Sequence, residues 1–155
     1  KNNILTITDK RMTRFNITLE ESVIFVLKCL KNMWGGELFI PKIPSYKIIE
    51  VAKSICPKAK LKFTGVRPGE KIHEEMITAT DGLNTVEFKD YYVILPNSDY
   101  IFWKRKNFIN KSSSHPGKIC KDGFNYNSGK NNKFLTIKEL KKLIIDHVPN
   151  GNILK

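Results

Sequence analysis

Apolar residues recur at helical spacing in three stretches of this chain, at residues 19–33, at residues 46–55 and from residue 136 onward. The first stretch has one apolar side, which we expect to face a core. The members of that side are Val23, Val26, Leu27 and Leu30. Gly35-Gly36 follows directly and predicts the end of the helix, because glycine readily adopts the backbone geometry of a helix terminus.

The other two predicted helices also have recognisable ends. Pro57 closes the helix of residues 46–55, since proline lacks a backbone N–H and cannot continue a helix. The last helix begins at a capping box, in which the side chains of Thr136 and Glu139 satisfy free backbone N–H groups. We expect this helix to bury Leu140, Leu143 and Ile144.

Runs of β-branched and aromatic residues lie between the helices and predict strands at residues 38–40, 61–64 and 86–95. Residues 71–77 read as a further short helix. Residues 97–133 are rich in Lys, Asn, Ser and Gly, and they predict long loops. The alternation of strands and helices indicates the α/β class.

The stretch TGVRPGEKIHEEMI, residues 64–77, carries the most specific chemistry. Pro68 fixes its own φ and favours extended geometry at Arg67, while Gly69 can adopt dihedral angles that other residues avoid. A guanidinium binds phosphate oxygens in a bidentate manner, and the Glu70 carboxylate accepts hydrogen bonds from ribose hydroxyls or a base N–H. The turn therefore suits a nucleotide diphosphate. A surface turn closed by an Arg-Glu ion pair is the alternative interpretation.

Five ordered blocks give the chain a family resemblance. They are TDKRMTRFNITL at residue 8, GGELFIPKIPSYKI at residue 35, the stretch at residue 64, FKDYYVILP at residue 88 and FNYNSGKNNKFLTIKEL at residue 124. Together they resemble the C-terminal part of the inverting UDP-N-acetylglucosamine 4,6-dehydratases. These are extended short-chain dehydrogenase/reductases of bacterial nucleotide-sugar, polysaccharide and pseudaminic acid biosynthesis.

The resemblance implies a reaction, most of which depends on residues outside this segment. Members of this family oxidise the sugar at C4 with NADP, eliminate water across C5 and C6, and return the hydride with inversion at C5, giving a 4-keto-6-deoxy sugar nucleotide. Their catalytic groups and their NADP-binding Rossmann half lie in the N-terminal part. No G-x-G-x-x-G turn occurs here. We therefore expect no catalytic or cofactor-binding residue in this segment and no metal, and we expect a homo-oligomer when the enzyme is complete.

The resemblance adds two substrate-binding residues, Arg14 and Thr6, to Arg67 and Glu70 of the turn, which gives four candidates. Arginines from separate segments can neutralise a diphosphate together, and both keep their charge at physiological pH. A salt bridge from Arg14 to Asp9 or Glu20 is the alternative for that residue.

Two of these positions have neighbours that depart from the family pattern. Family members have Trp where this chain has Asn16, and that difference removes a large apolar contact beside Arg14. The family usually has Pro around Thr6, which makes it the weakest of the four assignments.

The formal net charge of +12 permits two further interpretations. A basic protein can bind nucleic acid, but the lysines are dispersed among asparagines, whereas nucleic-acid recognition uses clustered phosphate- and base-contacting side chains. The same positive field would attract an anionic sugar nucleotide. A standalone sugar-nucleotide-binding or oligomerisation module is the other alternative function.

Three separated cysteines without a C-x-x-C motif predict neither a disulfide framework nor a zinc site. No secretory signal or membrane-length apolar run is visible, and we expect a cytoplasmic location. The first residue is Lys1, which suggests a truncated start. We divide the chain into a sugar-nucleotide-binding core at 1–96, a loop-rich extension at 97–134, and a C-terminal helix and tail at 135–155 that pack on the same domain.

Overall fold

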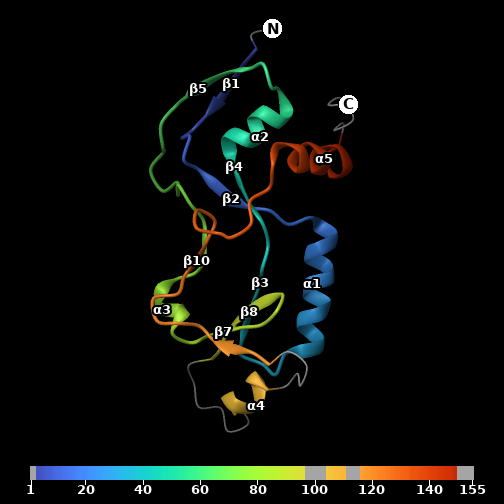
Figure 1. The fold of residues 1–155 in the computed structure, drawn as a ribbon, viewed down its shortest axis with the longest axis vertical. Coiled ribbons are helices and arrows are strands. Elements are labelled where there is room, and N and C mark those ends of the chain that lie inside the picture. Colours follow the sequence, from blue (N-terminus) through green and yellow to red (C-terminus); the bar gives the residue numbers. More distant parts are fainter. Residues whose placement is uncertain (1–2, 97–103, 111–115, 150–155) are drawn as a thin grey trace. The chain divides into compact units, whose positions relative to one another are not determined.

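The computed structural model describes residues 3–96, 104–110 and 116–149 (Figure 1). The chain forms two compact units that alternate along the sequence. Unit 1 comprises Lys1–Thr18, Ile43–Glu74 and Asn127–Lys155, and unit 2 comprises Leu19–Lys42 and Glu75–Tyr126. The three-part division of the sequence into 1–96, 97–134 and 135–155 stays a prediction.

Unit 1 combines two small sheets with two helices. Its elements are β1 (Ile4–Ile7), β2 (Thr13–Phe15), β4 (Ser45–Lys47), α2 (Ile48–Ile55), β5 (Lys60–Phe63) and α5 (Ile137–His147). Strand β1 pairs with β5 in parallel, and β2 pairs with β4 in antiparallel orientation. Helices α2 and α5 pack side by side (Figure 1). This arrangement places β2 and the chain after β5 in the same unit.

Unit 2 is built on a four-stranded antiparallel sheet with the strand order β3-β8-β7-β9. Its elements are α1 (Leu19–Asn32), β3 (Leu38–Pro41), β6 (Glu75–Ile77), α3 (Ala79–Gly82), β7 (Thr85–Glu87), β8 (Tyr91–Ile94), α4 (Arg105–Ile109) and β9 (Lys118–Ile119). A further strand, β10 (Tyr126–Asn127), pairs with β6. The core of the unit lies on one face of this sheet, and its buried members are Val86, Phe88, Tyr91, Val93, Leu95 and Phe108.

Several sequence predictions are confirmed. Helix α1 covers nearly all of the predicted 19–33 stretch, and Gly35 and Gly36 after it have φ values of 107° and 87°. Helix α5 begins at the predicted capping box, in which the Thr136 hydroxyl accepts from the Glu139 N–H and the Glu139 carboxylate accepts from the Thr136 N–H. Leu140 is buried, as expected. Among the described residues, no helix is both long enough and apolar enough to cross a membrane.

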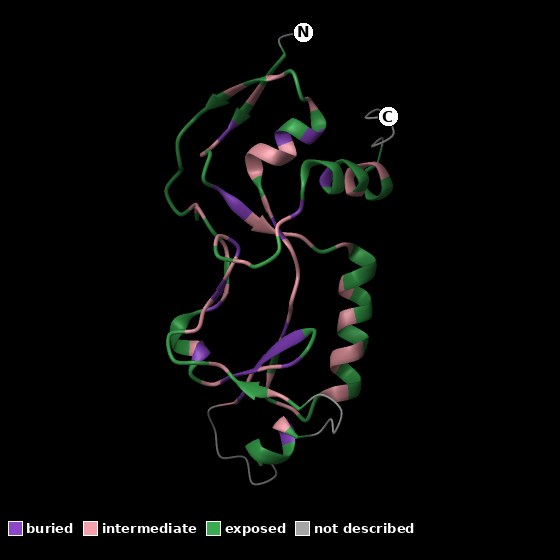
Figure 2. Cartoon of the chain, in the orientation of Figure 1, coloured by how far each residue is buried: buried purple, intermediate pink, exposed green. Residues whose placement is uncertain are grey.

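The predicted orientation of α1 is wrong, because its apolar side faces solvent rather than a core (Figure 2). The side chains of Val23, Val26, Leu27 and Leu30 are 52–60% exposed. The helix is held instead by Phe25, whose ring meets Tyr91 at 6.4 Å between centroids, and by Lys28, which forms an ion pair with Asp90 at 3.2 Å. Amphipathic spacing shows that a face is apolar but does not show what covers it.

Two predicted elements differ in kind from the observed ones. Residues 71–77 are not helical, because Glu75–Ile77 forms β6 and pairs with β10, which lies about 50 residues later in the chain. Residues 86–95 form a hairpin of β7 and β8 rather than one strand. The Phe88 N–H donates to the Tyr91 carbonyl at 2.9 Å, and this bond closes the turn between the two strands.

The predicted loop-rich region is only partly described. It contains the short helix α4 and strands β9 and β10, which the composition did not indicate. Residues 97–103 and 111–115 of that prediction lie outside the described residues.

Candidate functional site

Residues 67–70 form a tight turn that two hydrogen bonds close. The Glu70 N–H donates to the Arg67 carbonyl at 3.1 Å, and the Arg67 N–H donates to the Glu70 carboxylate at 2.9 Å. Gly69 has a φ of 83°, which favours glycine because it has no Cβ. The ion pair of the alternative interpretation does not form, since Glu70 binds the backbone of Arg67 and not its guanidinium.

The Arg67 side chain is exposed, and no ion pair or hydrogen bond engages its guanidinium in the described ranges. All five N–H donors of that group are therefore available to a ligand in this structure. The carboxylate that closes the turn lies three residues away and is half-buried. The turn thus presents the Arg67 guanidinium, unpaired among the described residues, on a backbone that the Glu70 carboxylate fixes.

The chain that leads into the turn is attached to the end of β1. The Thr64 N–H donates to the Ile7 carbonyl and the Gly65 N–H donates to the Thr8 carbonyl, each at 3.0 Å. Thr6 lies just upstream on β1, opposite Lys62 of β5, and its side chain is exposed. Within the described part of the chain, no hydrogen bond joins the Thr6 hydroxyl to Arg14, Arg67 or Glu70.

Arg14, on β2, reaches the residues that directly follow the turn. Its guanidinium donates to the carbonyls of Lys71 at 3.0 Å and Ile72 at 3.3 Å, and to its neighbour Thr13 at 2.7 Å. Its Nε lies 3.3 Å from the Glu74 carboxylate. The alternative partner Asp9 does not pair with Arg14 here, because its carboxylate binds Arg11 at 2.8 Å.

These contacts change the expected role of Arg14. Three hydrogen bonds to backbone carbonyls engage this guanidinium, and its Nε forms an ion pair with the Glu74 carboxylate. The side chain is 24% exposed, so it lies largely within unit 1. The structure therefore brings Arg14, Arg67 and Glu70 to one stretch of chain, with Arg14 holding the stretch and Arg67 projecting from it.

A buried hydrogen-bond network beside Arg14 was missed by the sequence analysis. The Thr13 hydroxyl lies 2.8 Å from Nδ1 of His73 and 2.7 Å from the Ser128 hydroxyl. Thr13 and Ser128 are buried, and His73 is exposed. Thr13 and Ser128 are 115 residues apart, so no local sequence signal could have indicated their contact.

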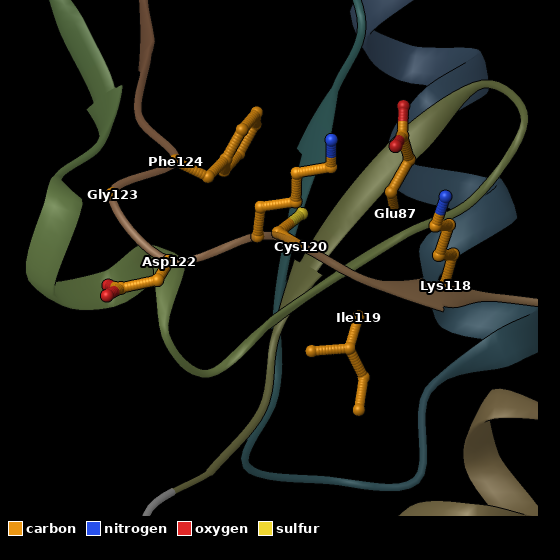
Figure 3. Close-up of a pocket in the computed structure, with 8 residues that line it drawn as sticks. Glu87, Lys118, Ile119, Cys120, Asp122, Gly123 and Phe124 are labelled. Carbon is orange, nitrogen blue, oxygen red and sulfur yellow. The ribbon is translucent and has the colours of Figure 1, made fainter.

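Unit 2 contains a hollow of about 360 Å³ that does not resemble a binding site (Figure 3). Glu87 and Lys118 point to the same side, but the Glu87 carboxylate is already paired with Lys42 at 2.7 Å. Burial raises the pKa of the Cys120 thiol to about 11, which keeps it protonated and unreactive near neutral pH. None of the four predicted site residues lines this hollow.

Comparison with known proteins gives a family for this chain. A family profile described as "Polysaccharide biosynthesis protein" matches residues 1–96. The chain belongs to this polysaccharide biosynthesis family. That match includes β1, β2 and the turn of residues 67–70.

Individual relatives agree with the resemblance found in the sequence. The chain is 45% identical over 140 residues to a UDP-N-acetylglucosamine 4,6-dehydratase (inverting) of Campylobacter jejuni serotype O:2, covering 90% of this chain and 42% of the relative. A UDP-glucose 4-epimerase of Rickettsia canadensis is 36% identical over 94 residues, covering 58% of this chain and 28% of the epimerase. The chain thus spans less than half the length of these relatives.

A solved structure supports the fold class. The X-ray structure of Pen from Bacillus thuringiensis superposes with a TM-score of 0.71 at 26% identity, over 100% of this chain and 43% of that one. The predicted class is therefore confirmed as an α/β chain that corresponds to a portion of an extended short-chain dehydrogenase/reductase.

Proposed function

We propose that this chain is the substrate-binding portion of an inverting UDP-N-acetylglucosamine 4,6-dehydratase, and that it binds the UDP moiety of its sugar nucleotide. The observation that carries the proposal is the turn of residues 67–70, whose exposed Arg67 guanidinium has no partner in the described ranges, on a chain 45% identical to such a dehydratase. A planar guanidinium is suited to bidentate phosphate binding.

Each candidate residue has a distinct part in this proposal. Arg67 binds the diphosphate directly, and Glu70 both closes the turn and offers its remaining acceptor sites to ribose hydroxyls. Arg14 holds the chain that follows the turn and adds its positive charge to the attraction of the anion. Thr6 is a proposed peripheral contact from β1. Binding of this kind would position the hexose, because energy gained at a remote group can be used to orient the reacting centre.

In this proposal NADP binding belongs to another part of the enzyme. A dinucleotide fold needs a strand, a glycine-rich turn and a helix in that order. The glycine pair at Gly35-Gly36 instead follows a helix, and the parallel strands β1 and β5 belong to unit 1 without such a turn between them. We therefore assign cofactor binding and catalysis to the part of the enzyme that corresponds to the relatives' residues outside the matched region. A role in pseudaminic acid synthesis, a cytoplasmic location and homo-oligomer formation stay predictions.

Helix α1 offers a contact surface for that part of the enzyme. Its apolar stripe is exposed, whereas the opposite side of the helix is attached to unit 2 through Phe25 and Lys28. A stripe of this length is unusual on a free surface and is typical of a protein contact. The dehydratase relative is more than twice as long as the matched region, so a covering domain of suitable size exists in the family. We infer that the dinucleotide-binding portion covers α1, in the same chain or as a separate one.

Isothermal titration with UDP and UDP-N-acetylglucosamine tests the binding proposal. We expect binding by the wild-type chain and a loss of about 100-fold in Arg67→Ala, since a charge-assisted bidentate contact contributes ~3 kcal/mol. Arg105→Ala on α4 is the matched control, because it removes the same charge elsewhere and should leave affinity unchanged. Equal losses in both variants would show non-specific attraction. Salt-sensitive DNA binding without a response to UDP would favour the nucleic-acid alternative.

A mixing experiment separates the substrate-binding portion from a standalone module. The N-terminal portion of the Campylobacter jejuni relative is produced separately and mixed with this chain. Formation of a complex and dehydratase activity in the mixture, both lost in a Val23→Lys/Leu30→Lys variant, supports the proposal. UDP binding with no complex and no activity would favour a standalone module.

A further inference from the structure

Strand β2 contacts the chain after the turn with two side chains that leave its opposite faces. Successive residues of a strand point to opposite sides, so Thr13 and Arg14 cannot share a face. Arg14 binds the carbonyls of Lys71 and Ile72, while the Thr13 hydroxyl binds His73. Between them, the Thr13 N–H donates to the Ile72 carbonyl at 3.0 Å. Residues 71–73 are thus held at three points by two adjacent residues.

Ser128 completes the contact on the Thr13 side. Its hydroxyl donates to the Thr13 carbonyl at 3.2 Å and accepts from the Glu74 N–H at 2.9 Å. Its backbone N–H donates to the Glu74 carbonyl at 2.8 Å. Glu74 also lies 3.3 Å from Nε of Arg14. The network therefore connects the position of Glu74 to the ion pair that orients the Arg14 guanidinium.

One assignment of hydroxyl donors satisfies every contact of this network, and it places a proton on Nδ1 of His73. Ser128 has one hydroxyl proton, and the Thr13 carbonyl can only accept, so Ser128 donates there. In this assignment the Thr13 hydroxyl donates to the Ser128 oxygen at 2.7 Å. It follows that Nδ1 of His73 donates to the Thr13 hydroxyl oxygen at 2.8 Å. All of these contacts are satisfied together only when Nδ1 carries a proton.

Gly129 fixes the His73 ring from another direction. A Cβ placed on Gly129 would lie 2.6 Å from both Cγ and Nδ1 of the imidazole, so the ring packs directly on the glycine backbone. The ring is therefore confined between a hydrogen bond to Thr13 and a steric contact with Gly129. A side chain at position 129 would displace the imidazole from Thr13.

We propose that His73 is a positioning residue, which acts with Thr13 and Ser128 to set residues 71–74 so that Arg14 and the Arg67 turn bind one diphosphate. This inference rests on the proposed function. His73 itself touches no ligand in this proposal, because Thr13 and Arg14 leave opposite faces of β2. Its effect on binding passes through the carbonyl groups of Lys71 and Ile72 that hold Arg14.

Paired variants of the full chain test the proposal by UDP titration. Thr13→Val and His73→Ala remove the hydrogen bond, and Gly129→Ala displaces the ring. We expect each to lower UDP affinity about tenfold, the order of effect of losing one hydrogen bond. Thr13→Ser and His73→Asn keep a hydroxyl and a donor in place, and they should stay within about twofold of the wild type. All titrations are run well below the melting temperature of each variant.

A spectroscopic readout makes the test independent of UDP binding. Long-range ¹⁵N–¹H spectra of the neutral His73 ring should show the proton on Nδ1 in the wild type and in Thr13→Ser, and loss of this preference in Thr13→Val. The Arg14 Nε–H signal should be protected from solvent exchange in the wild type and exchange faster in Thr13→Val and His73→Ala. An unchanged Arg14 signal in both variants would overturn the proposal, whether or not the chain binds UDP.

The proposed function and the positioning role of His73 can fail separately. If wild-type chain does not bind UDP but the Arg14 signal responds to His73→Ala, the proposed function fails and the structural coupling stands. If UDP binds and Arg67→Ala abolishes binding while Thr13→Val and His73→Ala bind normally, the positioning role is wrong and the proposed function stands.

Discussion

The Glu70 carboxylate accepts a hydrogen bond from the backbone N–H of Arg67 at 2.9 Å, while the guanidinium of the same Arg67 has no partner in the part of the chain that the structure describes. An ion pair between these side chains would have been the simplest outcome for an exposed turn. Because the acid binds the backbone instead, closing the turn leaves the cation free for an anion. This arrangement separates the structural task of Glu70 from the binding task of Arg67.

Substitutions of Glu70 should separate closure of the turn from charge. Glu70→Gln keeps a carbonyl oxygen that can accept from the Arg67 N–H, whereas Glu70→Ala removes the acceptor. We expect Glu70→Ala to weaken UDP binding about tenfold, the equivalent of ~1.4 kcal/mol, and Glu70→Gln to weaken it less. Titration calorimetry measures both. Equal losses would mean that the charge of Glu70, and not its closure of the turn, is what matters.

Arg67→Lys keeps the positive charge and removes the planar guanidinium with its paired N–H donors. Lysine is a point charge with a flexible stem, so it loses the bidentate geometry that suits a diphosphate. We expect UDP affinity to fall at least tenfold, with a melting temperature within about 1 °C of the wild type because the side chain is exposed. Thermal unfolding and titration on the same samples check both values. Full affinity in Arg67→Lys would show that charge alone attracts the ligand.

Short sequence motifs predicted the helix ends and the turn, because neighbouring residues determine these features. The end of α1 follows from Gly35 and Gly36, and the start of α5 follows from Thr136 and Glu139. In each case the residues that determine the helix end are close neighbours in the sequence. The turn at Pro68 and Gly69 was predictable for the same reason. Contacts between neighbouring residues depend little on the rest of the fold, so sequence alone can place them.

The errors lie where distant residues decide the structure. Residues 75–77 have a spacing that fits a helix, but pairing with β10 makes them extended. The candidate site shows the same limit, since a family resemblance could identify Arg14 but could not show that its donors bind the carbonyls of Lys71 and Ile72. The role of Thr13 depends on Ser128 and was likewise invisible in the sequence.

The Asp9 carboxyl should titrate at an unusually low pH. Hydrogen bonds from the Arg11 side chain and backbone lower the pKa of Asp9 from 3.8 to about 2. A depressed pKa means that this pair stabilises the folded chain above the unfolded pKa, and that the contribution is lost as the pH falls toward 2. Carbon-detected NMR titration should give a midpoint near 2, moving up toward 3.8 in Arg11→Ala. A midpoint near 3.8 in the wild type would contradict the pairing.

The capping box of α5 should make a measurable contribution to stability. Thr136→Ala removes the hydroxyl that accepts from the Glu139 N–H, and loss of such an N-cap costs about 0.5–2 kcal/mol. Thr136→Ser keeps the hydroxyl and should be close to the wild type. Urea unfolding followed by circular dichroism measures the difference. If Thr136→Ala and Thr136→Ser unfold at the same urea concentration, the cap does not contribute.

The exposed stripe of α1 should govern association of the chain without supporting its fold. Val23→Lys/Leu30→Lys replaces two side chains that are 52% and 60% exposed, so we expect reduced self-association and less binding of an apolar dye. The free energy of unfolding should change by less than about 0.5 kcal/mol, as for other exposed positions.

Phe25→Ala is the matched control on the same helix, because Phe25 packs on the core of unit 2. This control should lower the free energy of unfolding by about 0.5–3 kcal/mol and leave the stripe intact. Analytical ultracentrifugation and urea unfolding of both variants measure these effects. The opposite pattern, with the lysine variant unfolding readily and Phe25→Ala unaffected, would mean that the stripe packs inside the folded chain. It would then no longer be available to the dinucleotide-binding portion.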